Sequence, residues 1–181
     1  MPTVQVQHKD HTKLHYPDLL PISDRNIFYM RTGDVTTQTF TTGTITIELA
    51  TLTHDFSSME DAFTWDGVTN HDLTINRSGL YWLVAQGMFY RSSGSGDNNV
   101  ELALQEDAGS GFAAIPGATS YVSLVANHYG TIVIPTIVRV EAGFKYRLRA
   151  RRVIGSDTIG CSTAGSSLQA VCLIGTPDAN G

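Results

Sequence analysis

LTINRSGLYWLVAQGMFY, the stretch from Leu73 to Tyr90, decides the fold class of this 181-residue chain. It predicts a short strand, a turn at Gly79 and a long strand, because β-branched and aromatic residues flank a run of turn-forming residues. Short β-rich runs separated by Gly, Asn, Asp and Ser continue from Asn26 onward, without a segment of helical periodicity. The sequence therefore predicts an all-β domain.

The long strand in this stretch is apolar on both of its faces. Side chains alternate along a strand, so the side chain of Trp82 points away from those of Tyr81 and Leu83. A strand in an isolated sandwich normally buries one face only. The second apolar face therefore predicts a further protein layer, and a homo-oligomer is the simplest source of it. We expect the subunit contact to involve this strand, with the residues Tyr81, Trp82, Val84, Met88 and Tyr90.

The chain is expected to divide into an extended N-terminal arm, residues 1–25, and one β domain, residues 26–181. Its length is sufficient for one well-buried core and too short for two comfortable ones. The arm contains Pro2, Pro17 and Pro21 and has no sustained apolar period, so it cannot form a core of its own. We expect the arm to anchor the protein on a partner surface through its scattered apolar residues, which are Val4, Val6, Leu14, Tyr16, Leu19, Leu20 and Ile22.

The composition and the cysteines bear on the surface and the cellular compartment. Charged residues make up 16% of the chain, compared with about 25% in typical soluble domains, which predicts a largely neutral surface. No apolar run approaches the ~20 residues of a membrane helix, and no export segment is visible, so we expect no membrane partner. A hairpin turning at residues 164–166 would hold Cys161 and Cys172 too far apart to pair, which predicts two buried free thiols, as is typical of a cytoplasmic protein.

One strand, from Phe144 to Arg151, carries a basic face opposite an apolar one. Residues 139–181 hold six Lys or Arg and three Asp or Glu, whereas residues 1–138 hold six and fourteen. Three interpretations are open: salt bridges within an oligomer or to an acidic partner, a solvated face, or nucleic-acid binding. The net charge of −5 and the lack of a binding motif disfavour the last, so we predict no nucleic-acid partner. The basic face comprises Lys145, Arg147, Arg149 and Arg151, extended by Arg152.

Four segments in a fixed order carry a family resemblance: TITIELA at 44–50, SGLYWLVAQ at 78–86, VEAGFKYRLRA at 140–150 and SSLQAVCLIG at 166–175. The order resembles the jelly-roll superfamily of tumour necrosis factor and the complement globular heads, with Gly79, Tyr81 and Gly143 matching by type and place. The resemblance covers about residues 35–175. It implies an antiparallel two-sheet jelly-roll sandwich and a compact homotrimer with aromatic packing around the three-fold axis. A short arm followed by one such domain is similar to bacteriophage head decorations, head fibres and fibre tips.

We therefore expect a structural virion protein without enzymatic activity. It would be a homotrimer made in the host cytoplasm, located on the phage capsid surface and bound to the major capsid protein through its arm. The alternative is a receptor-binding or fibre-tip module whose loops, Arg91–Asn99 and Glu106–Thr119, contact host glycan or protein. Its candidate aromatic platforms are Trp65, Phe112 and Tyr121. We predict no catalytic, cofactor or metal residues, because nucleophile motifs, a cupin H-x-H and calcium-loop spacing are absent from the sequence.

Overall fold

The computed structural model describes residues 27–31, 38–49, 62–91, 94 and 96–175, and the structural statements below concern these residues. They form eleven β-strands and no helix. None of the described segments could therefore cross a membrane as an apolar helix. The strands are β1 (Ile27–Arg31), β2 (Gln38–Phe40), β3 (Thr44–Thr46), β4 (Phe63–Asp66), β5 (Asp72–Ile75), β6 (Gly79–Arg91), β7 (Asn98–Asp107), β8 (Ala113–Leu124), β9 (His128–Val140), β10 (Phe144–Ile154) and β11 (Ile159–Gly175).

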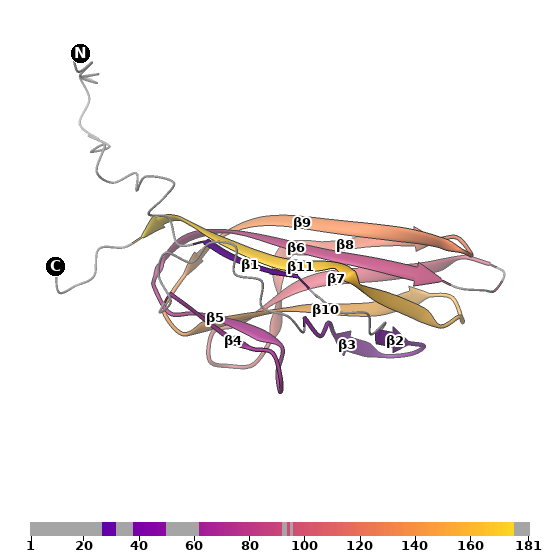
Figure 1. Cartoon of the computed structure of the whole chain (residues 1–181), viewed down its shortest axis with the longest axis horizontal. Coiled ribbons are helices and arrows are strands. Elements are labelled where there is room, and N and C mark those ends of the chain that lie inside the picture. The colour runs from indigo at the N-terminus through magenta and orange to yellow at the C-terminus, as the bar shows by residue number, and fades with distance from the viewer. Residues whose placement is uncertain (1–26, 32–37, 50–61, 92–93, 95, 176–181) are drawn as a thin grey trace, which may run out of the picture.

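The strands form two antiparallel sheets. Sheet A has the order β1-β11-β6-β9, with β2 also pairing with β11, and sheet B has the order β4-β5-β10-β7-β8, with β3 also pairing with β10. Figure 1 shows β1, β11, β6 and β9 in one layer, with β3, β4, β5 and β10 below it. The expected fold, an antiparallel two-sheet jelly-roll sandwich, is confirmed.

The core lies between the sheets and follows the period-two alternation of the long strands. On β6, Leu83 and Phe89 are fully buried, and on β10, Leu148 occupies the matching inner position. Gly87 also faces inward, and a Cβ at this position would collide with the ring of Phe89. The inner residues of β6, β7 and β10 thus interlock, as is typical of the face-to-face packing of two sheets.

The last strand, β11, differs from the expected hairpin. Residues 159–162 and 167–175 both pair with β6, and the register shifts between Ser162 and Ser167. Residues 164–166, where a turn is expected, therefore belong to a bulge within one long strand. Cys161 lies opposite Phe89 and Cys172 opposite Tyr81. The two thiols are free and buried, as predicted.

One expected loop contains a strand. β8 begins at Ala113, inside the expected loop Glu106–Thr119, and the short strand β4 lies at the other end of sheet B. Both are end strands in the order of sheet B, where one side of a strand lacks a neighbour and the apolar alternation is weak. Pro135, which has no amide hydrogen to donate, lies on β9, the strand that ends the order of sheet A.

The two ends of the sandwich carry different parts of the chain. Ile27 pairs with Val171, and Gly79 pairs with Gly175, so the described chain begins and ends at the same end, which we call the chain end. The connections β6–β7, β8–β9 and β10–β11 lie at the opposite end, which we call the loop end (Figure 1). The predicted arm lies outside the described residues, together with its proposed anchoring residues Val4, Val6, Leu14, Tyr16, Leu19, Leu20 and Ile22.

Candidate functional site

The outer face of sheet A carries an apolar surface formed by β6 and β9. Trp82 lies opposite Ile137 in the antiparallel register, and Tyr90 lies opposite Tyr129. The two tyrosine rings pack with their centroids 4.7 Å apart. We call this the β6–β9 surface, and it comprises Trp82, Val84, Met88, Tyr90, Tyr129, Val133 and Ile137.

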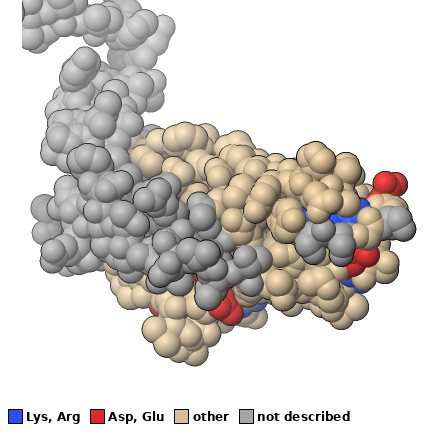
Figure 2. Space-filling model, turned by 45° about the vertical axis from the view of Figure 1, so that its right-hand side comes forward, with Lys and Arg blue, Asp and Glu red and all other residues tan. Residues whose placement is uncertain are grey.

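Exposure distinguishes the β6–β9 surface from ordinary sandwich strands. Ile137 is 63% exposed, Tyr129 61%, Val133 51% and Trp82 43%. Single exposed apolar residues are common, but a contiguous group on neighbouring strands marks an interaction site. Figure 2 shows a face of the molecule on which uncharged residues dominate and charged side chains gather towards the right-hand end and the lower margin. The β6–β9 surface is therefore a candidate subunit contact.

The predicted contact residues are only partly brought together. Trp82, Val84, Met88 and Tyr90 lie on the outer face of β6, as expected from their alternation. Tyr81 is wrongly included, because its side chain is fully buried between the sheets and its hydroxyl donates to the carbonyl of Arg77 at 3.0 Å. The β9 residues were missed, although apolar side chains at both alternate positions of residues 129–138 were the available signal.

The bulge of β11 borders the β6–β9 surface. The side-chain amide of Gln86 donates to the carbonyl of Gly165 at 2.9 Å, and the amide of Met88 donates to the hydroxyl of Ser166 at 3.2 Å. A Cβ at Gly165 would collide with the side chain of Met88. The bulge thus lies directly against Met88 and leaves the Trp82 half of the surface as the more accessible part.

The outer face of sheet B carries the predicted basic face, and the chain supplies a contact for each of four cations. Lys145 lies 3.9 Å from the carboxylate of Asp72. Arg147 donates from Nε to Oε1 of Gln105 at 2.9 Å and stacks over the ring of Phe112 at 3.9 Å. Arg149 and Arg151 share the carboxylate of Glu101, at 2.5 and 2.7 Å. These salt bridges lie within one chain, whereas the sequence suggested salt bridges within an oligomer or to an acidic partner.

Two buried carboxylates lie beneath these cations and respond differently to burial. Desolvation raises the pKa of Asp72, in opposition to the charge of Lys145. Desolvation acts in the same direction on Glu101, but hydrogen bonds from Arg151, Tyr121 and Arg149 outweigh it and hold the pKa of Glu101 below its usual range. Glu101 is 2% exposed and ionised at neutral pH, so it fixes the positions of the two arginines around it.

Arg152 does not belong to the basic face. It follows Arg151 directly and therefore points to the other side of β10. Its guanidinium donates to the backbone carbonyl of Asp157 in the turn between β10 and β11. The inclusion of Arg152 in the basic face is wrong, because the position one residue further along a strand faces the opposite way.

The loop end contains a buried arginine that sequence reasoning missed. Arg91 is 1% exposed, and its guanidinium donates to the carbonyls of Gly96 at 2.6 Å and Leu124 at 3.1 Å. It also forms an ion pair of 2.8 Å with Asp157, which accepts a hydrogen bond from the side chain of Asn98 at 2.8 Å. Three connections that are distant in sequence are thereby joined around one side chain.

The two loops proposed for receptor binding lie apart. The β6–β7 connection, within Arg91–Asn99, is at the loop end, whereas the β7–β8 connection, within Glu106–Thr119, is at the chain end. They cannot form one continuous binding surface. Of the proposed aromatic platforms, Phe112 is covered by Arg147 and Trp65 is partly buried on β4, while Tyr121 on β8 is 58% exposed.

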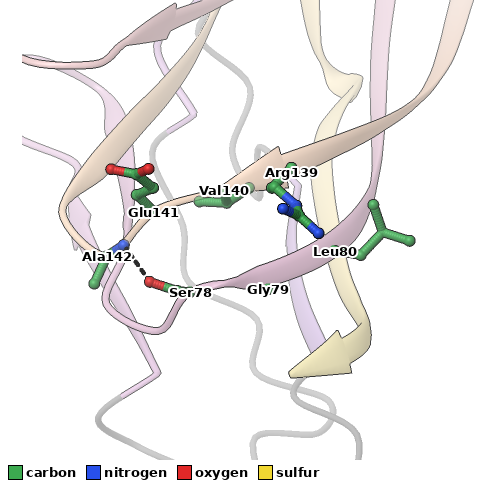
Figure 3. Close-up of a pocket in the computed structure, with 7 residues that line it drawn as sticks. All are labelled: Ser78, Gly79, Leu80, Arg139, Val140, Glu141 and Ala142. Atoms are coloured by element: carbon green, nitrogen blue, oxygen red, sulfur yellow. Dashed lines mark hydrogen bonds between the residues drawn. The ribbon is translucent and has the colours of Figure 1, made fainter. Parts of the chain in front are cut away.

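A pocket of about 640 Å³ lies at the chain end and is lined by Ser78, Gly79, Leu80, Arg139, Val140, Glu141 and Ala142. The side chain of Arg139 points towards Leu80, and the hydroxyl of Ser78 accepts a hydrogen bond from the amide of Ala142 at 3.0 Å (Figure 3). The lining residues of this pocket include no His or Cys. Within the described part of the chain, no three His, Cys, Asp or Glu residues are grouped to hold a metal ion.

Comparison by sequence finds no relative, since no protein-family model and no curated protein matches the chain. Comparison by structure does. The fold is similar to Eiger TNF from S. frugiperda, with a TM-score of 0.65 and 10% sequence identity over 86% of this chain and 96% of that chain. It is also similar to murine APRIL, with a TM-score of 0.57 and 10% identity over 82% of this chain and 99% of that chain. At such low identity the likeness establishes the fold alone, a tumour necrosis factor-like jelly-roll domain, as the family resemblance implied.

Proposed function

We propose that the chain is a non-enzymatic structural virion protein, a homotrimer that decorates and stabilises a phage capsid. In this proposal the β6–β9 surface forms the contact between subunits. The N-terminal arm binds the major capsid protein and holds the trimer on the outside of the shell. Binding that occurs only on the assembled shell stabilises that shell by mass action.

The single observation that carries the proposal is the exposed apolar surface on sheet A. Trp82, Tyr129, Val133 and Ile137 would lie in water in a monomer. Burying one such large side chain contributes on the order of 1.5–3 kcal/mol, so a contact that covers all four would be strongly favoured. The tumour necrosis factor-like fold supports a trimer as the form of this contact, because the family resemblance implies aromatic packing around a three-fold axis.

The placement of the chain ends supports anchoring through the arm. The first and last described strands reach the chain end, and the β6–β9 surface runs along the side of the sandwich. An arm that leaves from the chain end can therefore bind a surface below the trimer without crossing the subunit contact. The loop end would then point away from the shell.

Cryo-electron microscopy of intact particles, with and without residues 1–24, tests this proposal. We expect trimers spread over the shell of the complete particle, and trimers of the truncated protein that stay in solution. A truncated protein that still coats capsids would contradict anchoring by the arm. Density at a fibre end or tail tip alone would contradict decoration and favour the alternative function, a receptor-binding module.

A further inference from the structure

The strongest feature outside the β6–β9 surface lies on the opposite sheet, where Tyr121 and two arginines surround Glu101. Arg151, Glu101 and Tyr121 form one row across β10, β7 and β8, with Glu101 opposite both of the others in the antiparallel register. Directly opposite residues on one face have Cβ atoms about 5 Å apart. The side chains of Arg151 and Tyr121 therefore flank Glu101 on the outer face of sheet B.

This row is held rigidly by its own hydrogen bonds. Glu101 accepts hydrogen bonds from Arg151 through Oε2 and from Arg149 through Oε1, and Tyr121 lies directly opposite Glu101 in the antiparallel register. Because Tyr121 is 58% exposed, the ring presents an open apolar area to solvent.

The charge around this ring is positive at the surface. Arg151 is 46% exposed, and Arg149 is 23% exposed, whereas the single carboxylate of the group is 2% exposed beneath them. Each arginine has five N–H donors and uses Nη2 for Glu101, so the exposed part of Arg151 keeps donors for another group. The cluster has two positive charges and one negative charge, and the positive charges are the ones that a ligand would meet.

From this geometry we infer that Tyr121, Arg149 and Arg151 form a binding site for a carboxylated sugar, such as a hexuronic acid unit of an acidic polysaccharide. A pyranose ring presents a face of C–H groups that packs on an aromatic ring as other apolar groups do. A sugar carboxylate accepts paired hydrogen bonds from an arginine guanidinium with favourable geometry. The ring of Tyr121 matches the C–H face of such a sugar, and the neighbouring guanidinium matches its carboxylate.

The surroundings favour a sugar over a nucleic acid. Small polar residues border the ring: Ser123 donates to Asn99 at 2.6 Å in the next row, and Thr119 lies on the same strand, two residues before Tyr121. Nucleic-acid affinity comes from many cation–phosphate contacts along the backbone, and this cluster offers two arginines, whereas one uronic acid unit needs one guanidinium and one ring face. The site lies on sheet B, so a trimer built on sheet A leaves it open, and the inference does not depend on the capsid role.

Binding of trigalacturonate to the full-length protein, measured by saturation-transfer NMR and calorimetric titration, tests the inference. We expect saturation transfer to the sugar C–H protons, and at least tenfold weaker binding of the uncharged methyl ester, because charged hydrogen bonds are lost. This comparison uses the unaltered protein and is independent of any folding defect. An ester that binds as tightly as the acid would overturn the inference, as would the absence of saturation transfer at millimolar sugar.

Variants locate the site. Tyr121→Ala removes the ring, and Arg151→Gln removes one charge but leaves Glu101 paired with Arg149; each is expected to weaken binding at least fivefold. Tyr121→Phe keeps the ring and should retain binding within threefold. Arg139→Gln, which removes an exposed charge on sheet A, is the matched control and should leave affinity unchanged. Equal losses in Arg139→Gln and Arg151→Gln would contradict a defined site.

Discussion

Replacing Arg91 with methionine should loosen the loop end of the molecule and lower its stability. Arg91 is the largest of the fully buried side chains among the described residues. It satisfies the carbonyls of Gly96 and Leu124 and neutralises Asp157. Methionine is unbranched and fills much of the same space, so the change mainly removes the charge and the donors.

The expected loss follows from the contacts of Arg91. Removing one partner of a fully buried ion pair costs about 3–5 kcal/mol, but the side chain of Asp157 is 21% exposed, so water compensates part of this loss. We take about 1–2 kcal/mol for the lost ion pair and about 1 kcal/mol for each carbonyl that loses its donor. The sum is about 3–4 kcal/mol, which corresponds to a fall in Tm of about 6–16 °C for a domain of this size.

Urea unfolding monitored by circular dichroism measures this loss. Protein concentration must be held fixed, because the stability of an oligomer depends on it. A double-mutant cycle with Asp157→Asn isolates the ion pair, with an expected coupling of about 1–2 kcal/mol. A loss below about 1 kcal/mol in Arg91→Met, or a coupling near zero, would refute the idea that Arg91 joins the connections at the loop end.

Three further perturbations test other parts of the structure. Trp82→Asp places a charge on the β6–β9 surface and should yield monomers in sedimentation. The control Val68→Asp, in a turn where Val68 is 90% exposed, should leave the proposed trimer intact. If both variants sediment as trimers, the β6–β9 surface is not the subunit contact. Burial raises the pKa of the Cys161 thiol from its ordinary value of 9.0 to about 11. The unfolded chain therefore ionises first, so the free energy of unfolding should fall between about pH 9 and 11, and urea titrations of Cys161→Ala should show a smaller fall. Gly155→Ala should cost on the order of 2 kcal/mol or more by thermal unfolding, since Gly155 has φ +105° and a Cβ would meet a β7 side chain. Gly143→Ala, with φ +94° and no neighbour within 4 Å, should lower the free energy of unfolding by about half as much. Equal losses in the two variants would show that the contact with the β7 side chain costs nothing.

The period-two alternation of side chains made the outer faces of β6 and β10 predictable from the sequence. On β6 and β10 the inner positions are mainly apolar, with Arg91 and Arg152 as exceptions at the loop end, so the outward positions of Trp82 and of Lys145 followed from the period of two. The antiparallel sandwich followed from the number and spacing of such strands and from the family resemblance. These features are local, because a strand's alternation is independent of its partners.

Features that depend on contacts between distant segments were not predictable. β8 is an edge strand interrupted by Pro116 and Gly117, so its sequence resembles a loop. The bulge of β11 is defined by the register of β11 against β6. This register depends on both strands and cannot be read from the sequence of β11 alone. A charged residue at a strand end normally indicates solvent, and the burial of Arg91 results from acceptors on three separate connections.

The central place of β11 in sheet A has a consequence for synthesis. β11 is the last described strand, yet it lies between β1 and β6 and also pairs with β2. Until it leaves the ribosome, β1 and β2 have no partner in sheet A, and one edge of β6 stays open. A chain that stops early therefore cannot complete the sandwich, and its exposed apolar strands make it a substrate for chaperones and proteases. Only copies that include β11 can complete sheet A, which restricts assembly to subunits that carry this strand.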